Sequence, residues 1–174
     1  MKILSFGGST SSSSINRQLA NHAAGLVPSA EITPLDLRQF DLPIYSSDEE
    51  DANGVPGAAQ EFKQLIDSHD AIVVSLAEHN GSYSAAFKNL YDWTSRIDTK
   101  VWSDKPMLLM ATSPGGRGGA TVLEAAKATF PRMGADLKAT FSLPAFYENF
   151  SAEEGVTNPE FKTALDEAIA AFSA

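Results

Sequence analysis

The sequence predicts an α/β fold in which a five-stranded parallel sheet is covered by helices on both faces. Short apolar runs alternate with segments of helical periodicity along the chain of 174 residues. The run at residues 70–77, DAIVVSLA, is almost continuously apolar, as a central strand buried on both faces requires. Strands that alternate with helices are joined by right-handed crossovers and form a parallel sheet. We therefore expect one domain, residues 1–174, with the strand order 2-1-3-4-5.

The first part of the chain supplies the strands and helices that precede the central strand. Residues 2–6 form a short apolar strand that ends at two glycines, and residues 15–27 carry apolar side chains at helical spacing. Residues 32–37 alternate as a second strand. Residues 41–57 combine acidic and turn-forming residues and are interpreted as a long loop. A second helix is expected over residues 56–69.

The alternation continues after the central strand. A helix is expected over residues 82–97 and a fourth strand over residues 105–112. A further helix over residues 120–134 leads to a fifth strand over residues 136–143. The chain ends in an amphipathic helix over residues 158–172, with a proline near its first turn.

The composition excludes several classes of function. Thirteen basic and 22 acidic residues give a formal net charge of −9, which disfavours binding to nucleic acids and to anionic membranes. The absence of cysteine excludes disulfides, thiolate nucleophiles and cysteine-ligated metal centres, so redox chemistry requires a bound cofactor. The first apolar stretch is too short for a signal peptide and no run has membrane length, so we expect a cytoplasmic protein.

Hydrolytic and metal sites find little support. The three histidines lie in unrelated segments and no Gly-x-Ser-x-Gly elbow occurs, so a hydrolase triad is disfavoured. The acidic run at residues 48–51 lacks the spacing of a calcium loop and is interpreted as solvated. We expect no metal ion.

Three unusual loops follow strands 1, 3 and 4 of the predicted sheet. In this strand order, ligands bind beyond the carboxyl ends of the strands, close to the point at which the order reverses. The loops are GGSTSSSSIN at residues 7–16, AEHNGSYS at residues 77–84 and SPGGRGG at residues 113–119. Because they follow neighbouring strands, we expect them to form one site.

The first loop predicts a site for a single phosphate. Hydroxyl groups and free backbone N–H groups ahead of a helix bind anions, and the helix dipole favours negative charge. The loop has neither the lysine of a triphosphate-binding loop nor a G-x-G-x-x-G pattern. The candidate contacts are Ser9, Ser11, Ser14 and Asn16. The alternative is that one serine caps the helix and the others are solvated.

The second and third loops can bring backbone groups close to a ligand. Glu78, His79, Asn80 and Gly81 leave the central strand, and Ser82 or Ser84 is placed to cap the next helix. The third loop has four glycines around Arg117, whose guanidinium could meet a negative group. The alternatives are a plain turn with a surface histidine and a flexible connection with a solvated arginine.

Together these segments resemble the NAD(P)H-dependent FMN reductases of flavodoxin-like fold, a family that includes chromate and quinone reductases and some azoreductases. The resemblance covers nearly the whole chain and rests on the first and third loops, on FDLPIY at residues 40–45 and on EHNGSYSAAFKNLYDWTSR at residues 78–96. It implies a flavodoxin-like three-layer sandwich that binds FMN.

The resemblance also implies which residues contact the cofactor. In the first loop these are Ser9, Ser11, Ser14, Ile15 and Asn16, around the phosphate. In the second loop they are Glu78, His79, Asn80, Gly81 and Ser82, along the isoalloxazine. In the third loop they are Ser113, Gly115, Gly116 and Arg117, on the other side of the ring. Pro43 and Tyr45 would lie near the flavin or a partner subunit.

The activity that the resemblance implies is hydride transfer from NADPH or NADH through FMN to a second acceptor in a ping-pong cycle, with no catalytic side chain. A quinone, an azo compound, a metal oxyanion or free flavin are candidate acceptors, and a homodimer or homotetramer is expected. The alternatives are a flavodoxin-like electron carrier that does not oxidise NAD(P)H, and a homologue that no longer binds flavin.

Two residues depart from the family pattern. Ser11 stands where members commonly have an arginine, so one charged contact to the phosphate is missing, and Arg17 is a candidate replacement. His79 stands in the place of a tyrosine in the family's Pro-Glu-Tyr-Asn segment. We expect these departures to affect FMN affinity and the contacts of the flavin ring.

Overall fold

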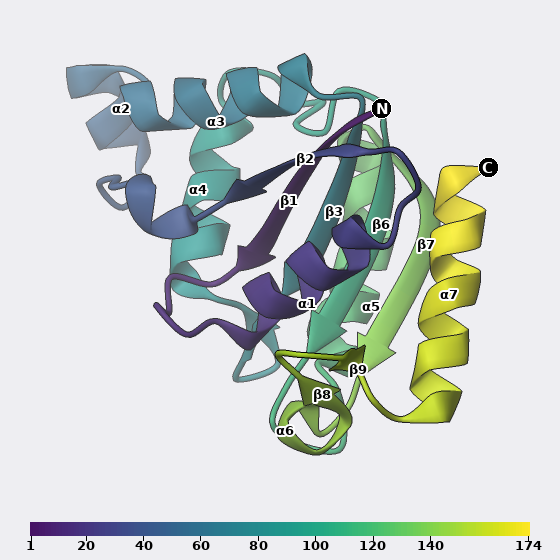
Figure 1. The fold of residues 1–174 in the computed structure, drawn as a ribbon. Helices are drawn as coiled ribbons and strands as arrows, with labels where there is room; N and C mark the ends of the chain where they lie inside the picture. Colours follow the sequence, from purple (N-terminus) through teal and green to yellow (C-terminus); the bar gives the residue numbers. More distant parts are fainter.

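The computed structural model describes all of residues 1–174 as a three-layer α/β sandwich (Figure 1). Its central sheet consists of β1 (Lys2–Gly8), β2 (Glu31–Leu35), β3 (Ala71–Leu76), β6 (Lys105–Thr112) and β7 (Ala135–Leu143). All neighbouring strands are parallel and the order is β2-β1-β3-β6-β7. Numbered within this sheet alone, the order is 2-1-3-4-5, so the predicted flavodoxin-like fold class is confirmed.

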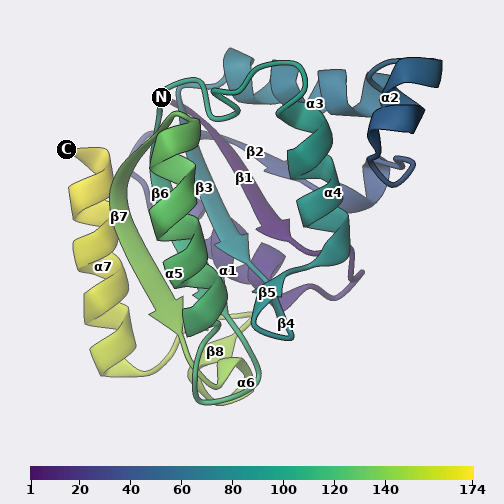
Figure 2. The same cartoon turned by 180° about the vertical axis from the view of Figure 1, so that it is seen from behind.

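Helices cover both faces of the sheet. On one face lie α1 (Ile15–Gly25) and α7 (Pro159–Ser173), and on the other lie α3 (Gly57–Ser68), α4 (Ala85–Thr94) and α5 (Ala120–Thr129). Figures 1 and 2 show the two faces in turn. None of these helices combines the length and the apolar character that crossing a lipid bilayer demands.

The central strand β3 explains why the sheet has two cores. All six of its residues are buried, so both of its faces need apolar side chains. Ile72 and Val74 belong to the core under α3, α4 and α5. Val73 belongs to the core under α1 and α7. The near-continuous apolar run in the sequence follows from this double burial.

The segment interpreted as a long acidic loop contains a helix, α2 (Ser47–Asn53). The Ser46 hydroxyl accepts a hydrogen bond from the Glu49 N–H at 3.1 Å, and acidic side chains in the first turn complement the helix dipole. Because α2 buries none of its residues, it leaves no apolar periodicity in the sequence. The prediction of a loop was wrong for these residues.

Several boundaries differ from the prediction by one or more residues, and two of them lie next to 3-10 turns. The second strand ends at Leu35 because the Asp36 carboxylate caps a short 3-10 helix, η1 (Leu37–Gln39). The helix expected over residues 120–134 ends at Thr129, where the backbone tightens into a 3-10 turn, η2 (Phe130–Met133).

The second loop forms a β-hairpin ahead of α4. Its strands are β4 (Glu78–His79) and β5 (Ser82–Tyr83), and Asn80 and Gly81 occupy the turn with φ of 52° and 76°. Asn-Gly is the sequence that such turns favour. As a result α4 begins at Ala85 and not at residue 82, and it is Ser84 that caps the helix, accepting from the Phe87 N–H at 3.2 Å.

The chain makes an additional excursion between β7 and α7. Residues 144–157, here named the C-terminal excursion, contain α6 (Phe146–Asn149) and a hairpin of β8 (Phe150–Ser151) and β9 (Gly155–Val156). Figures 1 and 2 show α6 and β8 beyond the carboxyl ends of the strands, on the side of the sheet where the three loops lie. The sequence had not indicated this excursion.

Candidate functional site

A polar pocket of about 180 Å³ opens beyond the carboxyl ends of β1, β3 and β6. Its lining consists of Ser9, Ser11, Ser13, Ser14, Ile15, Asn16, Ala77, Glu78, His79, Thr112, Ser113, Pro114 and Tyr147. All five expected residues of the first loop are therefore brought together with residues of the second and third loops. Four lining residues, Ala77, Thr112, Pro114 and Tyr147, were not predicted, and Ser13 was expected to lie near the ligand only through its backbone.

Six of the expected residues do not line this pocket. They are Asn80, Gly81, Ser82, Gly115, Gly116 and Arg117. The first three form the tip and second strand of the β4–β5 hairpin. The other three are exposed in the third loop, so any contact with a ligand would have to take place outside the pocket.

The first loop leaves backbone donors free at the start of α1. The Ser14 hydroxyl accepts a hydrogen bond from the Arg17 N–H at 3.1 Å, so this buried serine caps the helix. The N–H groups of Ser12, Ser13, Ile15 and Asn16 make no hydrogen bond within the protein. Free donors at the positive end of an 11-residue helix suit a negatively charged group.

The side chain of Asn16 connects the first loop to two strands. It is 3% exposed, and its Oδ1 accepts from the Ser75 hydroxyl at 2.7 Å and from the Thr112 N–H at 3.1 Å. Its Nδ2 donates to the Thr112 carbonyl at 3.2 Å. The amide thus holds α1 against β3 and β6, and it is the backbone N–H of Asn16 that is free for a ligand.

Gly7 allows the first strand to approach α1 closely. A Cβ at this position would lie 2.3 Å from the backbone nitrogen of Arg17, a separation that no side chain tolerates. The glycine after the apolar run is therefore required by packing, whereas the serines that follow it supply the polar surface of the pocket.

Arg17 braces the first loop from outside the pocket. Its guanidinium pairs with the Asp36 carboxylate and donates to the Ser12 carbonyl at 2.6 Å. Hydrogen bonds from Arg38, with the charge of Arg17 in addition, lower the pKa of Asp36 to about 2. Arg17 does not line the pocket. The structure therefore does not support the expectation that Arg17 takes the place of the arginine that family members commonly have at the position of Ser11.

The side chain of Glu78 joins the second loop to the third. Its Oε2 accepts hydrogen bonds from the backbone N–H groups of Thr121 at 2.9 Å and Val122 at 3.0 Å. Since α5 has no side-chain cap at Gly119, this carboxylate satisfies the first turn of that helix. The His79 side chain, in contrast, is exposed at the pocket and makes no hydrogen bond within the protein.

The third loop is held by bonds within itself and to neighbouring strands. The Ser113 hydroxyl donates to the Gly115 carbonyl at 3.1 Å, and Arg117 donates to the Thr121 hydroxyl at 2.9 Å. A Cβ on Gly118 would lie 2.4 Å from the Ser142 hydroxyl, so only glycine fits there. Arg117 is thereby directed to α5.

The residues present fit a phosphate monoester such as that of FMN. Serine hydroxyls and unpaired N–H groups surround the pocket, and its one carboxylate, on Glu78, is already engaged by α5. A cavity of about 180 Å³ is smaller than the ~300–1,000 Å³ of complete ligand pockets, so it accommodates only part of such a cofactor.

Comparison with known proteins agrees with this geometry. Residues 1–148 match the family of NADPH-dependent FMN reductases. The chain is 33% identical over 123 residues to an NAD(P)H-dependent FMN reductase of Pseudomonas aeruginosa, covering 69% of this chain and 64% of that protein. It is 36% identical over 122 residues to a 2-hydroxy-1,4-benzoquinone reductase of a Burkholderia species, with the same coverage. The matches thus span less than two thirds of these relatives' own length.

A solved structure extends the similarity to the full fold. The flavoenzyme NAD(P)H:(acceptor) oxidoreductase of Paracoccus denitrificans superimposes with a TM-score of 0.77 and 27% identity, covering 99% of this chain and 94% of that one. The C-terminal hairpin and α7 follow the family match, which ends at residue 148. On the match over residues 1–148, the chain belongs to the family of NADPH-dependent FMN reductases.

Proposed function

We propose that this protein is an oxidoreductase that uses FMN to pass electrons from NAD(P)H to a small-molecule acceptor. The observation that carries the proposal is the pocket at the carboxyl ends of β1, β3 and β6, where serine hydroxyls and unpaired N–H groups meet at the start of α1. The family to which the chain belongs supports FMN as the ligand of this pocket.

The residues of the chain bind and orient the cofactor. The hydroxyls of Ser9, Ser11 and Ser13, with the N–H groups of Ile15 and Asn16, would hold its phosphate. The side chains of Asn16 and Glu78 keep the three loops at fixed positions. Held there, FMN would supply the two-electron chemistry that links NAD(P)H to the second substrate in a ping-pong cycle.

We infer that the acceptor is a quinone. One relative is named as a benzoquinone reductase, and the exposed His79 at the pocket offers a ring for packing and nitrogens for a hydrogen bond to a quinone oxygen. No side chain acts as an essential base in this scheme, because electron transfer takes place on the cofactor. The need for NAD(P)H supports a cytoplasmic location.

We further infer a homodimer or homotetramer. The pocket in one chain is smaller than a complete cofactor site, so a neighbouring copy would complete it. An apolar groove of about 560 Å³ borders the first loop, and Ile44 at its edge is 77% exposed. Light scattering of the purified protein measures the mass; a monomer at micromolar concentration would contradict this inference.

Titration of the apoprotein with FMN, followed by turnover assays, tests the function. We expect saturable binding of FMN, and oxidation of NADPH or NADH that depends on both FMN and benzoquinone. Binding of FMN without oxidation of NAD(P)H would favour an electron carrier. A chain that binds no FMN would overturn the enzyme and the carrier alike.

A further inference from the structure

The pocket has one wall that none of the three loops supplies. Tyr147 of α6 lines the pocket together with the serines of the first loop, yet its side chain is 73% exposed. Ligand pockets are commonly lined by aromatic side chains, whose large apolar faces are covered when the ligand binds. The exposed ring of Tyr147 therefore requires an explanation.

The backbone immediately before Tyr147 is fixed to the third loop. The Ala145 N–H donates to the Gly115 carbonyl at 2.9 Å, and the Phe146 N–H donates to the Ser113 carbonyl at 3.1 Å. Ala145 has φ of 46° and ψ of 58°, a left-handed conformation that a residue with a Cβ keeps only where its surroundings impose it. The position of Tyr147 is thus imposed by the structure around it.

Side chains of the C-terminal excursion hold α6 from the other side. Phe146 is 3% exposed and stacks on Phe150, with ring centroids 4.6 Å apart. The Asn149 Nδ2 donates to the Pro144 carbonyl at 2.9 Å, which closes the turn that contains Tyr147. The exposed Tyr147 therefore directly follows Phe146, whose buried ring stacks on Phe150.

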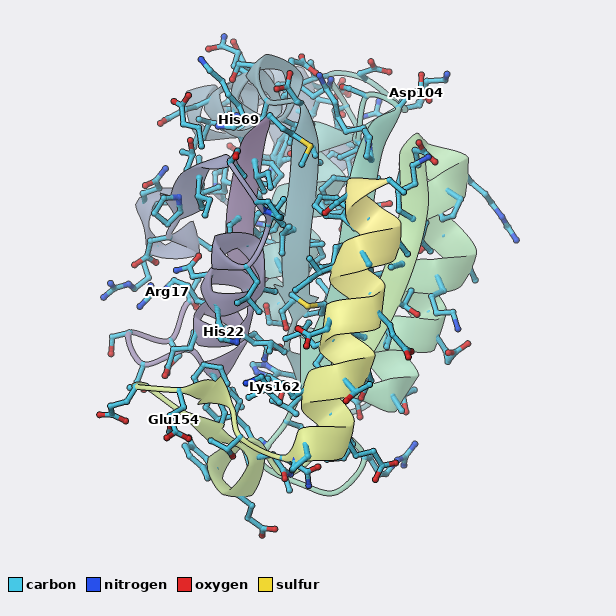
Figure 3. The ribbon with its side chains drawn as sticks, turned by 45° about the vertical axis from the view of Figure 1, so that its right-hand side comes forward. Arg17, His22, His69, Asp104, Glu154 and Lys162 are labelled. Carbon is cyan, nitrogen blue, oxygen red and sulfur yellow. The ribbon has the colours of Figure 1, made fainter.

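The hairpin of the excursion rests on α1, the helix whose first turn forms the phosphate pocket. The His22 ring meets Phe150 edge-on at 5.5 Å between centroids. A Cβ on Gly155 would lie 1.8 Å from the His22 Cε1, so the hairpin passes directly over this ring. Figure 3 shows His22 on α1 close to the hairpin that carries Glu154. The excursion is anchored to two walls of the pocket.

We propose that the ring of Tyr147 is a cofactor-binding group which the C-terminal excursion adds to the site. It packs against the phosphate and ribityl part of bound FMN, excludes water from the serine-lined pocket and slows release of the cofactor. The inference rests on the proposed function. The hairpin that braces Tyr147 follows the residues that match the family, and together with α6 it fixes the ring at the pocket.

We assign the contact to the ring of Tyr147 because the ring is the large apolar surface that this residue brings to the pocket. The hydroxyl makes no hydrogen bond within the protein, so Tyr147→Phe separates its contribution from that of the ring. Shielding from water strengthens hydrogen bonds between the phosphate and the first loop. Such shielding compensates for Ser11, which provides a hydroxyl where an arginine would provide a charge.

Three variants test the proposal on the apoprotein. Tyr147→Ala removes the ring, Tyr147→Phe keeps it, and Glu148→Ala is the matched control because Glu148 is exposed on the same helix and does not line the pocket. Flavin fluorescence measures the Kd for FMN and the rate of its release, and thermal unfolding of the apoprotein reports the fold of each variant.

For Tyr147→Ala we expect release about tenfold faster and binding weaker to a similar degree, with an unchanged Tm of the apoprotein. Tyr147→Phe should recover most of that loss, and Glu148→Ala should match the wild type. Wild-type affinity in Tyr147→Ala would overturn the proposal, as would a Tyr147→Phe variant as weak as Tyr147→Ala. A wild-type protein without FMN affinity would overturn the proposed function itself, which distinguishes the two failures.

Discussion

Polar side chains gather at both ends of the central sheet, and the two groups are built differently. At the amino end, the nearly buried Lys63 donates to Asp67 and to the Ser103 hydroxyl, the latter at 2.6 Å. His69 is bonded through both ring nitrogens, to the Leu65 carbonyl and the Thr33 hydroxyl. Figure 3 shows His69 near this end, far from Glu154 at the other.

At the carboxyl end, the polar groups are left open. The N–H groups of Ser12, Ser13 and Ile15 have no acceptor, and the His79 side chain has no hydrogen-bond partner. Buried polar groups need partners to be stable, whereas groups at a water-filled pocket can exchange water for a ligand. In this fold, the paired polar groups at the amino end serve the structure, whereas the groups without partners at the carboxyl end are available to a ligand.

Asn16 is an exception at the carboxyl end of the sheet, because its side chain is buried and fully hydrogen-bonded. Asn16→Ala removes the hydrogen bonds of its amide to the Ser75 hydroxyl and to the backbone N–H and C=O of Thr112, and we expect a loss of about 3 kcal/mol in the free energy of unfolding. Urea denaturation of the apoprotein measures it. Ser9→Ala, at an only partly buried residue, is the control and should cost little. An unchanged stability with weakened FMN binding would mean that the Asn16 side chain serves the ligand.

A variant of Lys63 tests whether the paired polar groups at the amino end serve stability and not ligand binding. Lys63→Met keeps the aliphatic volume but removes the hydrogen bonds to Asp67 and Ser103, and we expect the free energy of unfolding to fall by about 2 kcal/mol. Affinity for FMN should remain unchanged. Lys100→Met removes a more exposed pair with Asp104 and is the control, for which little change is expected. A variant of Lys63 that loses FMN affinity would contradict the division between the two ends.

Ser11 lines the pocket at the carboxyl end and offers a hydroxyl to a ligand but no charge. Ser11→Arg places a charge at the phosphate pocket, and we expect FMN to bind about fivefold more tightly, with unfolding little affected. The gain should shrink at high salt. Gln18→Arg adds the same charge on an exposed position of α1 that does not line the pocket, and serves as the control. Equal gains from both variants would indicate a general effect of net charge.

Asp36 gives the smallest expected effect. Its pKa is about 2 in the folded protein and 3.8 as an ordinary aspartate, so the folded state favours the charged form. The stabilisation is complete above about pH 4 and is lost as the pH falls toward 2. We expect the stability of Asp36→Asn, measured by urea denaturation at pH 5 and pH 3, to fall less over this interval than that of the wild type. Parallel losses in the two proteins would refute the assignment.

The fold could be predicted because burial determines which residues of the strands and helices are apolar. The run at β3 is apolar on both faces and the helices carry apolar stripes, so the five strands and their order follow from pattern and crossover rules. Helix α2 escaped prediction because nothing in it is buried. The Ser46 and Glu49 pair, at capping-box spacing, was the signal that would have located it.

The position of the site followed from the carboxyl-end rule, but the roles of its side chains did not. Glu78 is turned toward α5, and Arg117 bonds to Thr121, because of where that helix begins in space. No local pattern in the sequence contains this information. Tyr147 was missed for a related reason, since the left-handed turn at Ala145 has neither glycine nor asparagine to indicate it.

The bonds of Asn16 also connect the pocket to the order in which the chain folds. Its partners Ser75 and Thr112 are 59 and 96 residues away in the sequence. Contacts of such separation carry a large loop-closure cost, so they form more slowly than the pairing of β1 with its own helix. The phosphate pocket cannot be complete until β3 and β6 have docked. The rate at which refolding protein gains the ability to bind FMN would therefore report the rate at which β3 and β6 dock onto β1 and α1.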